Sequence, residues 1–147
     1  MVFRVLYVFS GIRRKANLKY WLGLGGKTAS MDIVVEEVDV LHGSEHDLLN
    51  EDVWRKLRGR IKAGEFDAIV ISPPCSTYSR SRLNKRGGPP PLRSRKYPWG
   101  FPWLAGKRRD KIENANALIR ITLEVLSIAG DLHIPFVLEF PEDLGMK

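Results

Sequence analysis

The stretch FDAIVISPPCSTYS, residues 66–79, carries the main indication of the fold. Its first part, residues 66–72, is a nearly continuous apolar run, which is typical of a strand buried on both faces of a parallel sheet. Two prolines then stiffen the following turn and hold Cys75, the single cysteine of the chain, beyond the end of that strand. Similar apolar runs occupy residues 2–9, 32–40 and 134–140.

Helical patterns alternate with these four runs. A short helix is expected over residues 16–26, ended by its glycines, and a second over residues 50–64, with Asn50 as the N-cap and Gly64 closing it. A longer helix is expected from residue 111 to about residue 130. Its predicted buried stripe consists of Ala115, Leu118, Ile119, Thr122, Val125, Leu126 and Ala129. Alternating strands and helices predict an α/β fold with a compact, Rossmann-like parallel sheet covered on both faces.

The composition is that of an ordinary globular protein. With 147 residues the chain is long enough for one domain, and we expect that domain to span residues 1–147. No apolar stretch approaches the roughly 20 residues of a membrane helix. The apolar N-terminus lacks a basic leader and a cleavage site, and one cysteine excludes an internal disulfide. We therefore expect a soluble protein of the cytoplasm or nucleus, neither secreted nor bound to a membrane.

The net charge of +7 is concentrated in one segment. Residues 80–111 contain eleven Lys or Arg residues and one acid, Asp110, so this segment carries +10 and the remaining chain −3. Its glycines and prolines predict a long loop over residues 79–111. A segregated basic patch with interleaved aromatic residues is suited to phosphates and splayed bases. The candidate nucleic-acid contacts are Arg80, Arg82, Lys85, Arg86, Arg93, Arg95, Lys96, Trp99, Trp103, Lys107, Arg108 and Arg109.

Two plainer interpretations of this segment stay open. One is a solvated loop that is basic without binding nucleic acid, since charged runs commonly face water. Its aromatic motif WGFPW, residues 99–103, would in that case pack the loop back onto the domain.

Ligands of parallel α/β sheets bind at the carboxyl ends of the strands. There the sequence places a glycine turn, SGIRR, at residues 10–14. The second strand ends with Glu36, Glu37 and Asp39, and an acid at that point can accept hydrogen bonds from a ribose diol. Cys75 follows the third strand and Glu139 the fourth. A thiol and a carboxylate at one sheet edge suit nucleophilic attack on a ring with acid assistance. An inert, partly buried cysteine and a merely polar strand end are the alternatives.

These residues give the chain a resemblance to a known family. LYVFSGIRRKANL (6–18) resembles the first cofactor motif of the cytosine-5 DNA methyltransferases, and SPPCSTYS (72–79) resembles their Pro-Cys nucleophile motif. VLEFPEDLG (137–145) stands where the family has a Glu-Asn-Val or Glu-Asn-Pro motif, and VDVLHGSEHDLL (38–49) where acidic residues hold the cofactor. The resemblance runs in the family's order over nearly the whole chain and covers the family's N-terminal, catalytic half.

The resemblance implies an S-adenosylmethionine-dependent cytosine-5 methyltransferase of class I fold that acts on nucleic acid, in the first place DNA. Cys75 would add to C6 of a flipped-out cytosine, and Glu139 would contact the base edge and assist protonation at N3. The basic segment would stand where the family has a mobile loop that closes over DNA. The implied cofactor-binding residues are Phe9, Ser10, Gly11, Asp39, Asp47 and Pro74.

The sequence also departs from the family pattern. Arg13 replaces a glycine of the first motif, Phe140 replaces the asparagine after the glutamate, and the family's later motifs have no counterpart. One alternative is therefore a methyltransferase-fold protein that binds nucleic acid or a nucleotide without catalysis. Another is one subunit or fragment of a split enzyme, with a second subunit or a further copy completing the site. A third is a compact relative that methylates a simpler substrate. A metal site at His42, His46 and Asp47 is not expected, because this stretch is predicted to be a loop.

Overall fold

The computed structural model describes residues 1–79, 82 and 87–141. Its centre is a four-stranded sheet in the order β2-β1-β3-β4, in which every pairing is parallel. The strands are β1 (Val2–Val8), β2 (Asp32–Val38), β3 (Ala68–Ile71) and β4 (Phe136–Leu138). The predicted α/β class with a parallel sheet is therefore confirmed, and the architecture is compatible with a Rossmann-like fold.

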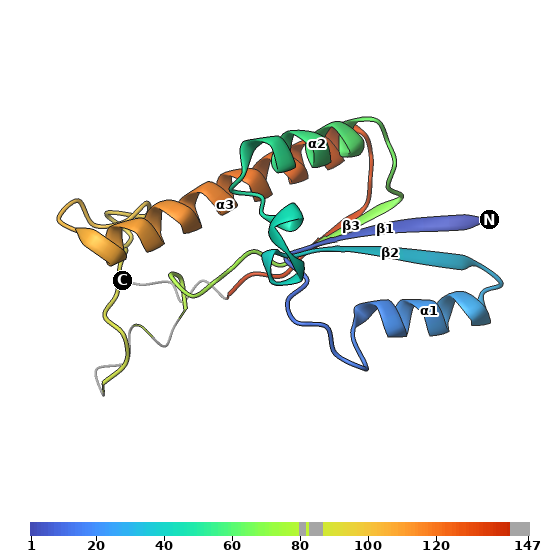
Figure 1. Ribbon diagram of the computed structural model, residues 1–147, viewed down its shortest axis with the longest axis horizontal. Helices are drawn as coiled ribbons and strands as arrows, with labels where there is room; N and C mark the ends of the chain where they lie inside the picture. The colour runs from blue at the N-terminus through green and yellow to red at the C-terminus, as the bar shows by residue number, and fades with distance from the viewer. Residues whose placement is uncertain (80–81, 83–86, 142–147) are drawn as a thin grey trace.

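Helices cover both faces of this sheet. α2 (Glu51–Lys62) and α3 (Gly106–Asp131) lie on one face and α1 (Leu18–Thr28) on the other (Figure 1). Two short 3-10 helices, η1 (Val40–His42) and η2 (Ser44–His46), connect β2 to α2. None of the helices in the described ranges is both long and apolar enough to cross a membrane.

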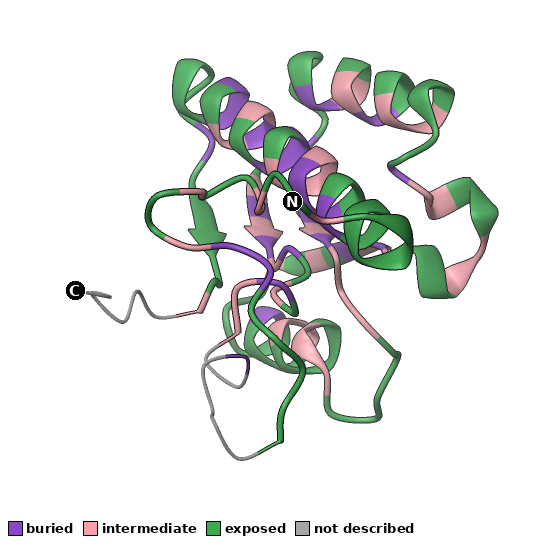
Figure 2. Ribbon diagram, turned by 90° about the vertical axis from the view of Figure 1, so that its left-hand side faces the viewer, coloured by how far each residue is buried: buried purple, intermediate pink, exposed green. Residues whose placement is uncertain are grey.

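The main core lies between the sheet and the pair α2 and α3. Leu6, Ile69 and Ile71 from the sheet have no exposed surface and pack with Ile61 of α2 and Val125 of α3. Burying such side chains stabilises a fold by about 1.5–3 kcal/mol each. β4 differs, because all three of its residues are exposed at the edge of the sheet (Figure 2). The core therefore fixes the centre of the sheet and the last two thirds of α3.

Three sequence-based boundaries need correction. The glycines do not end α1, which continues to Thr28. Gly26 packs closely against the chain entering β2, because a Cβ on Gly26 would lie 2.6 Å from the Met31 carbonyl oxygen. The long helix begins at Gly106 and not at residue 111, so residues 107–111 are helical and the predicted loop 79–111 is shorter. The strands are shorter at their ends than the apolar runs that predicted them. In α3, Ile121 and Ile128 are buried in addition to the predicted stripe, whereas Leu118, Ile119 and Leu126 are half-buried.

Candidate active site

The strand order creates a switch point between β1 and β3. From β1 the chain passes to β2 on one side, and it later returns to place β3 on the other side of β1. The Ser72 amide donates to the Val8 carbonyl oxygen at 3.1 Å, so the segments that leave these two strands start side by side. In open parallel sheets such a switch point forms the ligand crevice. Phe9–Gly11 and Ser72–Cys75 are therefore the segments in which to look for a site.

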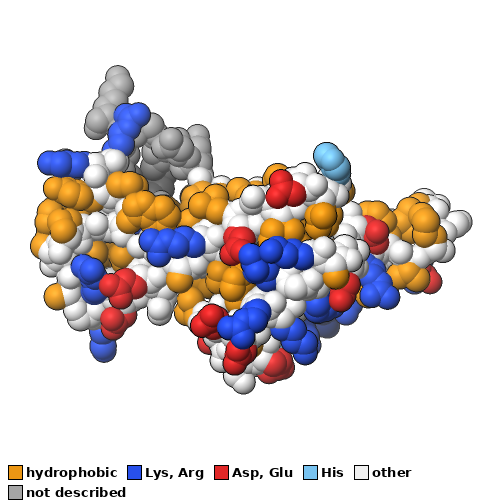
Figure 3. Space-filling view, turned by 90° about the horizontal axis from the view of Figure 1, so that it is seen from above, with side chains coloured by type: hydrophobic (Ala, Val, Ile, Leu, Met, Phe, Trp, Pro, Cys, Tyr) orange, Lys and Arg blue, Asp and Glu red, His pale blue; other side chains and the backbone are white. Residues whose placement is uncertain are grey.

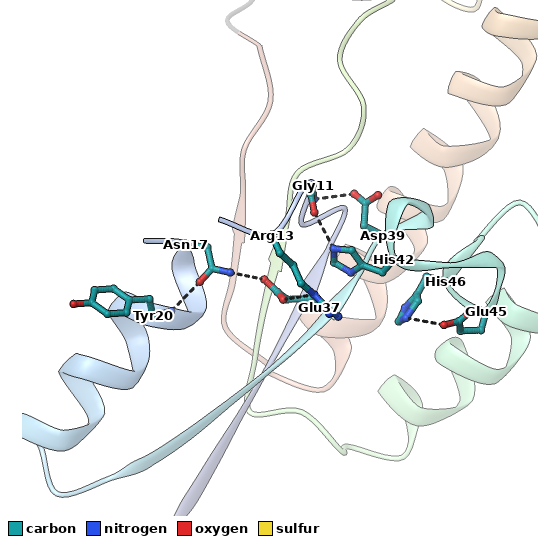
Figure 4. A network of polar contacts seen from close by, with 9 residues as sticks. All are labelled: Gly11, Arg13, Asn17, Tyr20, Glu37, Asp39, His42, Glu45 and His46. Carbon is teal, nitrogen blue, oxygen red and sulfur yellow. Dashed lines mark hydrogen bonds and ion pairs between the residues drawn. The ribbon is translucent and has the colours of Figure 1, made fainter. Parts of the chain in front are cut away.

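The turn after β1 is held by hydrogen bonds from β2 and η1 (Figure 4). The Gly11 amide donates to Asp39 Oδ2 at 2.8 Å, and His42 Nε2 lies 3.0 Å from the Gly11 carbonyl oxygen. Asp39 Oδ1 accepts the Leu41 amide at 2.9 Å. Phe9 and Gly11 both have a positive φ, of 61° and 73°, which is an uncommon conformation for a phenylalanine and often marks a functional turn. Asp39 thus holds this turn with Oδ2 and caps η1 with Oδ1.

Glu37 is a second carboxylate at this turn, and the sequence singled out Asp39 instead. Its side chain is only 7% exposed; Oε1 accepts from Asn17 Nδ2 at 3.1 Å and Oε2 lies 3.6 Å from Arg13 Nε. Strand alternation could have predicted the burial of the Glu37 side chain, because residue 37 lies on the same face of β2 as Ile33 and Val35, the face toward α1. Arg13 is 68% exposed and pairs with Glu37, so this ion pair is exposed on one side only.

The turn also contains unused hydrogen-bond capacity. Ser10 Oγ and His42 Nδ1 are buried, and neither has a hydrogen-bond partner among the described residues. Buried polar atoms in native proteins are paired in the large majority of cases. A Cβ built on Gly11 would meet no atom within 4 Å, so the space beside this glycine is open. A polar ligand at the turn would fit both observations.

Cys75 and Glu139 follow neighbouring strands. Cys75 is half-buried in the turn after β3, and the Glu139 amide donates to the Ile71 carbonyl oxygen at 3.0 Å, which fixes Glu139 beside the end of β3. The Tyr78 and Phe140 rings meet edge to face at 5.0 Å, so the segments carrying the thiol and the carboxylate pack against each other. The Cys75 thiol is therefore partly shielded, whereas the Glu139 side chain is exposed to solvent.

Arg93 braces the cysteine turn against α3. Its guanidinium donates to Thr77 Oγ1 at 2.8 Å and to Asn116 Oδ1 at 3.1 Å, and it stacks 3.8 Å from the Tyr78 ring centroid. Burial lowers the pKa of Arg93, and burial also raises the pKa of the Tyr78 hydroxyl, although the nearby Arg93 charge acts against that second shift. One buried side chain therefore connects the turn of Cys75 to the loop and to the long helix.

The candidate nucleic-acid residues divide into two groups. Arg82 and Arg93 are 8% and 9% exposed. Arg82 donates to the carbonyl oxygens of Ser76 and Pro90, so both arginines serve the fold, and we assign them no contact with nucleic acid. The exposed group contains Arg95, Lys96, Trp99, Trp103, Lys107, Arg108 and Arg109. Arg80, Lys85 and Arg86 lie outside the described residues.

This exposed group lies at the end of the molecule that carries the start of α3, where basic and hydrophobic side chains are interspersed (Figure 3). The first turn of α3 contains no acidic residue and no side-chain cap. Cations there lie next to the positive end of the helix dipole, so this end attracts anions. It forms the candidate surface for a phosphate backbone.

The aromatic motif WGFPW both packs inward and stays accessible. Phe101 stacks on Trp103 with ring centroids 4.7 Å apart, and the Phe101 amide donates to the Leu92 carbonyl oxygen at 3.0 Å. The Trp99 and Trp103 side chains nevertheless remain 48% and 66% exposed. The loop therefore packs onto the domain while it presents two indole rings to solvent.

Two further predicted cofactor residues make no contact within the described ranges that points to a ligand. Asp47 caps a turn by accepting the Leu49 amide at 3.0 Å, and Pro74 is exposed beside Cys75. The His42 and His46 rings lie 5.7 Å apart, and the described part of the chain contains no group of three potential ligands placed to hold a metal ion.

Comparisons with protein-family models, with curated proteins and with solved structures found no match for this chain.

Proposed function

We propose that this chain is a class I methyltransferase-like enzyme that modifies cytosine in nucleic acid, with Cys75 as its nucleophile. The observation that supports this proposal is the placement of Cys75 and Glu139 after neighbouring parallel strands, next to the switch point between β1 and β3. A thiol, a carboxylate and a glycine turn at one sheet edge are the parts that nucleophilic attack on a ring requires.

The turn after β1 suits S-adenosylmethionine, which supplies an electrophilic methyl group when bound. The unpartnered Ser10 Oγ and His42 Nδ1 and the open space beside Gly11 favour a polar ligand there. Phe9, Ser10 and Gly11 would line its site, and Asp39 holds their turn in place. Glu37 and Asp39 are the carboxylates nearest to this turn, and a ribose diol would have to share them with their present partners.

The residues of the chain then have distinct roles. The Cys75 thiolate would add to C6 of the cytosine, because the thiolate and not the thiol is the nucleophile. This addition makes C5 nucleophilic, while the Glu139 carboxyl supports the N3 edge of the ring. After methylation, a water molecule accepts the C5 proton while the bond between Sγ and C6 breaks with its electron pair going to sulfur, which restores the aromatic ring and the free thiolate. The exposed cations at the start of α3 would hold the phosphate backbone of the substrate, in the first place DNA.

The test is transfer of a labelled methyl group from S-adenosylmethionine to cytosine-containing DNA. We expect label in the DNA with the wild-type protein and with Ser76→Ala, an exposed neighbour of the nucleophile. Cys75→Ser should give none. Transfer by Cys75→Ser at the wild-type rate would refute the assigned nucleophile.

A second function, nucleic-acid binding without catalysis, is favoured by one observation. The carboxylates of Asp39 and Glu37 are already engaged by Gly11, Leu41, Asn17 and Arg13. Calorimetry with S-adenosylhomocysteine separates the two functions. Micromolar binding that is lost in Asp39→Ala but kept in Asp32→Ala, an exposed acid at the start of β2, supports the enzyme. Absence of binding by a folded protein that still binds DNA supports the second function.

A further inference from the structure

A cavity of about 650 Å³ lies between the WGFPW loop and the first half of α3, and its lining shares no residue with the turns after β1 and β3. Cavities of this size commonly hold small ligands or parts of larger ones. Its walls combine aromatic and charged side chains, namely Trp99, Phe101, Arg109, Ile112, Glu113 and Arg120.

The floor of this cavity is fixed by the packing of the loop onto the helix. Asn116 Nδ2 donates to the Trp99 carbonyl oxygen at 2.8 Å. Gly100 has a φ of 111°, and a Cβ there would lie 2.6 Å from Ile112 Cγ2, so the close approach requires glycine. The position of the loop on the helix, and with it the floor of the cavity, is thus fixed by buried contacts.

One wall offers an aromatic surface beside a guanidinium. The Trp99 ring is about half exposed, and Arg120 Cζ lies 5.0 Å from its centroid. No acidic side chain among the described residues pairs with Arg120. The guanidinium lies over one face of the indole, so a base would stack on the opposite face and place its phosphate on Arg120.

The charged residues of the cavity lie along one face of α3. Residues 109, 113, 116 and 120 are spaced by three or four, and Arg109 and Arg120 are about 16 Å apart along the helix axis. Arg109 Nε also bonds Glu113 Oε1 at 2.7 Å, which places a carboxylate acceptor between the two cations. A groove of this length fits a short stretch of strand better than one nucleotide.

We propose that this cavity binds a single-stranded segment of nucleic acid, with one base stacked on Trp99 and phosphates on Arg120 and Arg109. The inference rests on the proposed nucleic-acid function and adds to it a preference for unpaired strand. Bases within a duplex are stacked on each other and leave no free face for the indole. Arg120 lies outside the basic segment that the sequence indicated, so the fold alone brings it to this site.

The experiment measures binding of a labelled 12-nucleotide single strand, its duplex and a mononucleotide to the whole chain by fluorescence anisotropy and tryptophan quenching. Trp99→Ala should weaken single-strand binding about tenfold, whereas Trp21→Ala, an exposed tryptophan on α1, should not. Arg120→Gln should reduce the slope of log K against log salt by about 0.7, and Arg55→Gln on α2 should leave it unchanged.

The outcomes separate this inference from the proposed function. If the wild type binds no nucleic acid, both fail. If it binds, but Trp99→Ala and Arg120→Gln behave like their controls, nucleic acid binds the exposed cations at the start of α3. The proposal that the cavity binds a single strand is then overturned. Equal affinity for the mononucleotide and the 12-mer would overturn the assignment of a strand in favour of a free nucleotide. Equal affinity for duplex and single strand, with both variants impaired, would overturn the preference for unpaired strand.

Discussion

Replacing Arg93 by alanine tests the brace between the cysteine turn and α3. Thr77 and Asn116 are 3% and 7% exposed, and each would lose the guanidinium that it now contacts. A buried polar group left without a partner costs about 1–3 kcal/mol. Loss of the contact with the Tyr78 ring adds about 0.5–2 kcal/mol, and release of a buried charge offsets part of the total.

We therefore expect Arg93→Ala to lower the free energy of unfolding by about 3 kcal/mol, measured by urea denaturation. For a chain of this length that loss corresponds to a decrease in Tm of roughly 6–12 °C. Arg93→Lys should be intermediate, because one ammonium cannot reproduce the forked contacts. Lys107→Ala, which removes an exposed cation at the start of α3, should change stability by less than about 0.5 kcal/mol. A loss of less than about 0.5 kcal/mol in Arg93→Ala would refute the claim that Arg93 holds the cysteine turn against α3.

Three further predictions concern pH, the cavity and the basic surface. Arg60 donates to both oxygens of Glu36 at 2.6 and 2.7 Å, and this contact lowers the pKa of Glu36. The pair therefore stabilises the fold fully above the unfolded pKa of about 4.3, and this stabilisation is lost as pH falls through the lower folded pKa. Glu36→Gln should therefore flatten the acid limb of a plot of stability against pH, and an unchanged limb would contradict the pair's role. Gly100→Ala should lower the free energy of unfolding by more than about 1 kcal/mol in thermal or urea unfolding, because the alanine Cβ would collide with Ile112. Wild-type stability of this variant would show that the loop does not lie on the helix. Charge reversal within residues 107–109 should weaken DNA binding and flatten its salt dependence in a titration at several salt concentrations, and unchanged binding would rule out this surface.

The parts of the fold that follow from local pattern could be predicted from the sequence. The four apolar runs predicted the four strands, because central parallel strands are apolar on both faces; the run of β4 also formed a strand, although its residues are exposed at the sheet edge. The ends of α2 were also predictable: the Asn50 side chain accepts the amides of Asp52 and Val53, and Gly64 has a positive φ just beyond the helix.

The features that depend on distant contacts could not be predicted. α1 runs through its glycines because packing of Gly26 on β2 outweighs their low helix propensity. The start of α3 has no side-chain cap and carries cations against the helix dipole, so the usual indications of a helix start are missing. Arg93 looks like any other cation of the basic segment until the fold brings Thr77 and Asn116, 16 and 23 residues away, to its guanidinium.

The most direct test of the central claim, that Cys75 attacks the cytosine ring, is intact mass measurement after incubation with DNA containing 5-fluorocytosine and S-adenosylmethionine. Fluorine at C5 cannot leave as a proton does, so the bond between Sγ and C6 would persist after methyl transfer. The proposal predicts a denaturation-resistant complex of protein and DNA with wild type and Ser76→Ala, and none with Cys75→Ser. A wild-type protein that binds both DNA and S-adenosylhomocysteine yet forms no such complex would contradict the claim.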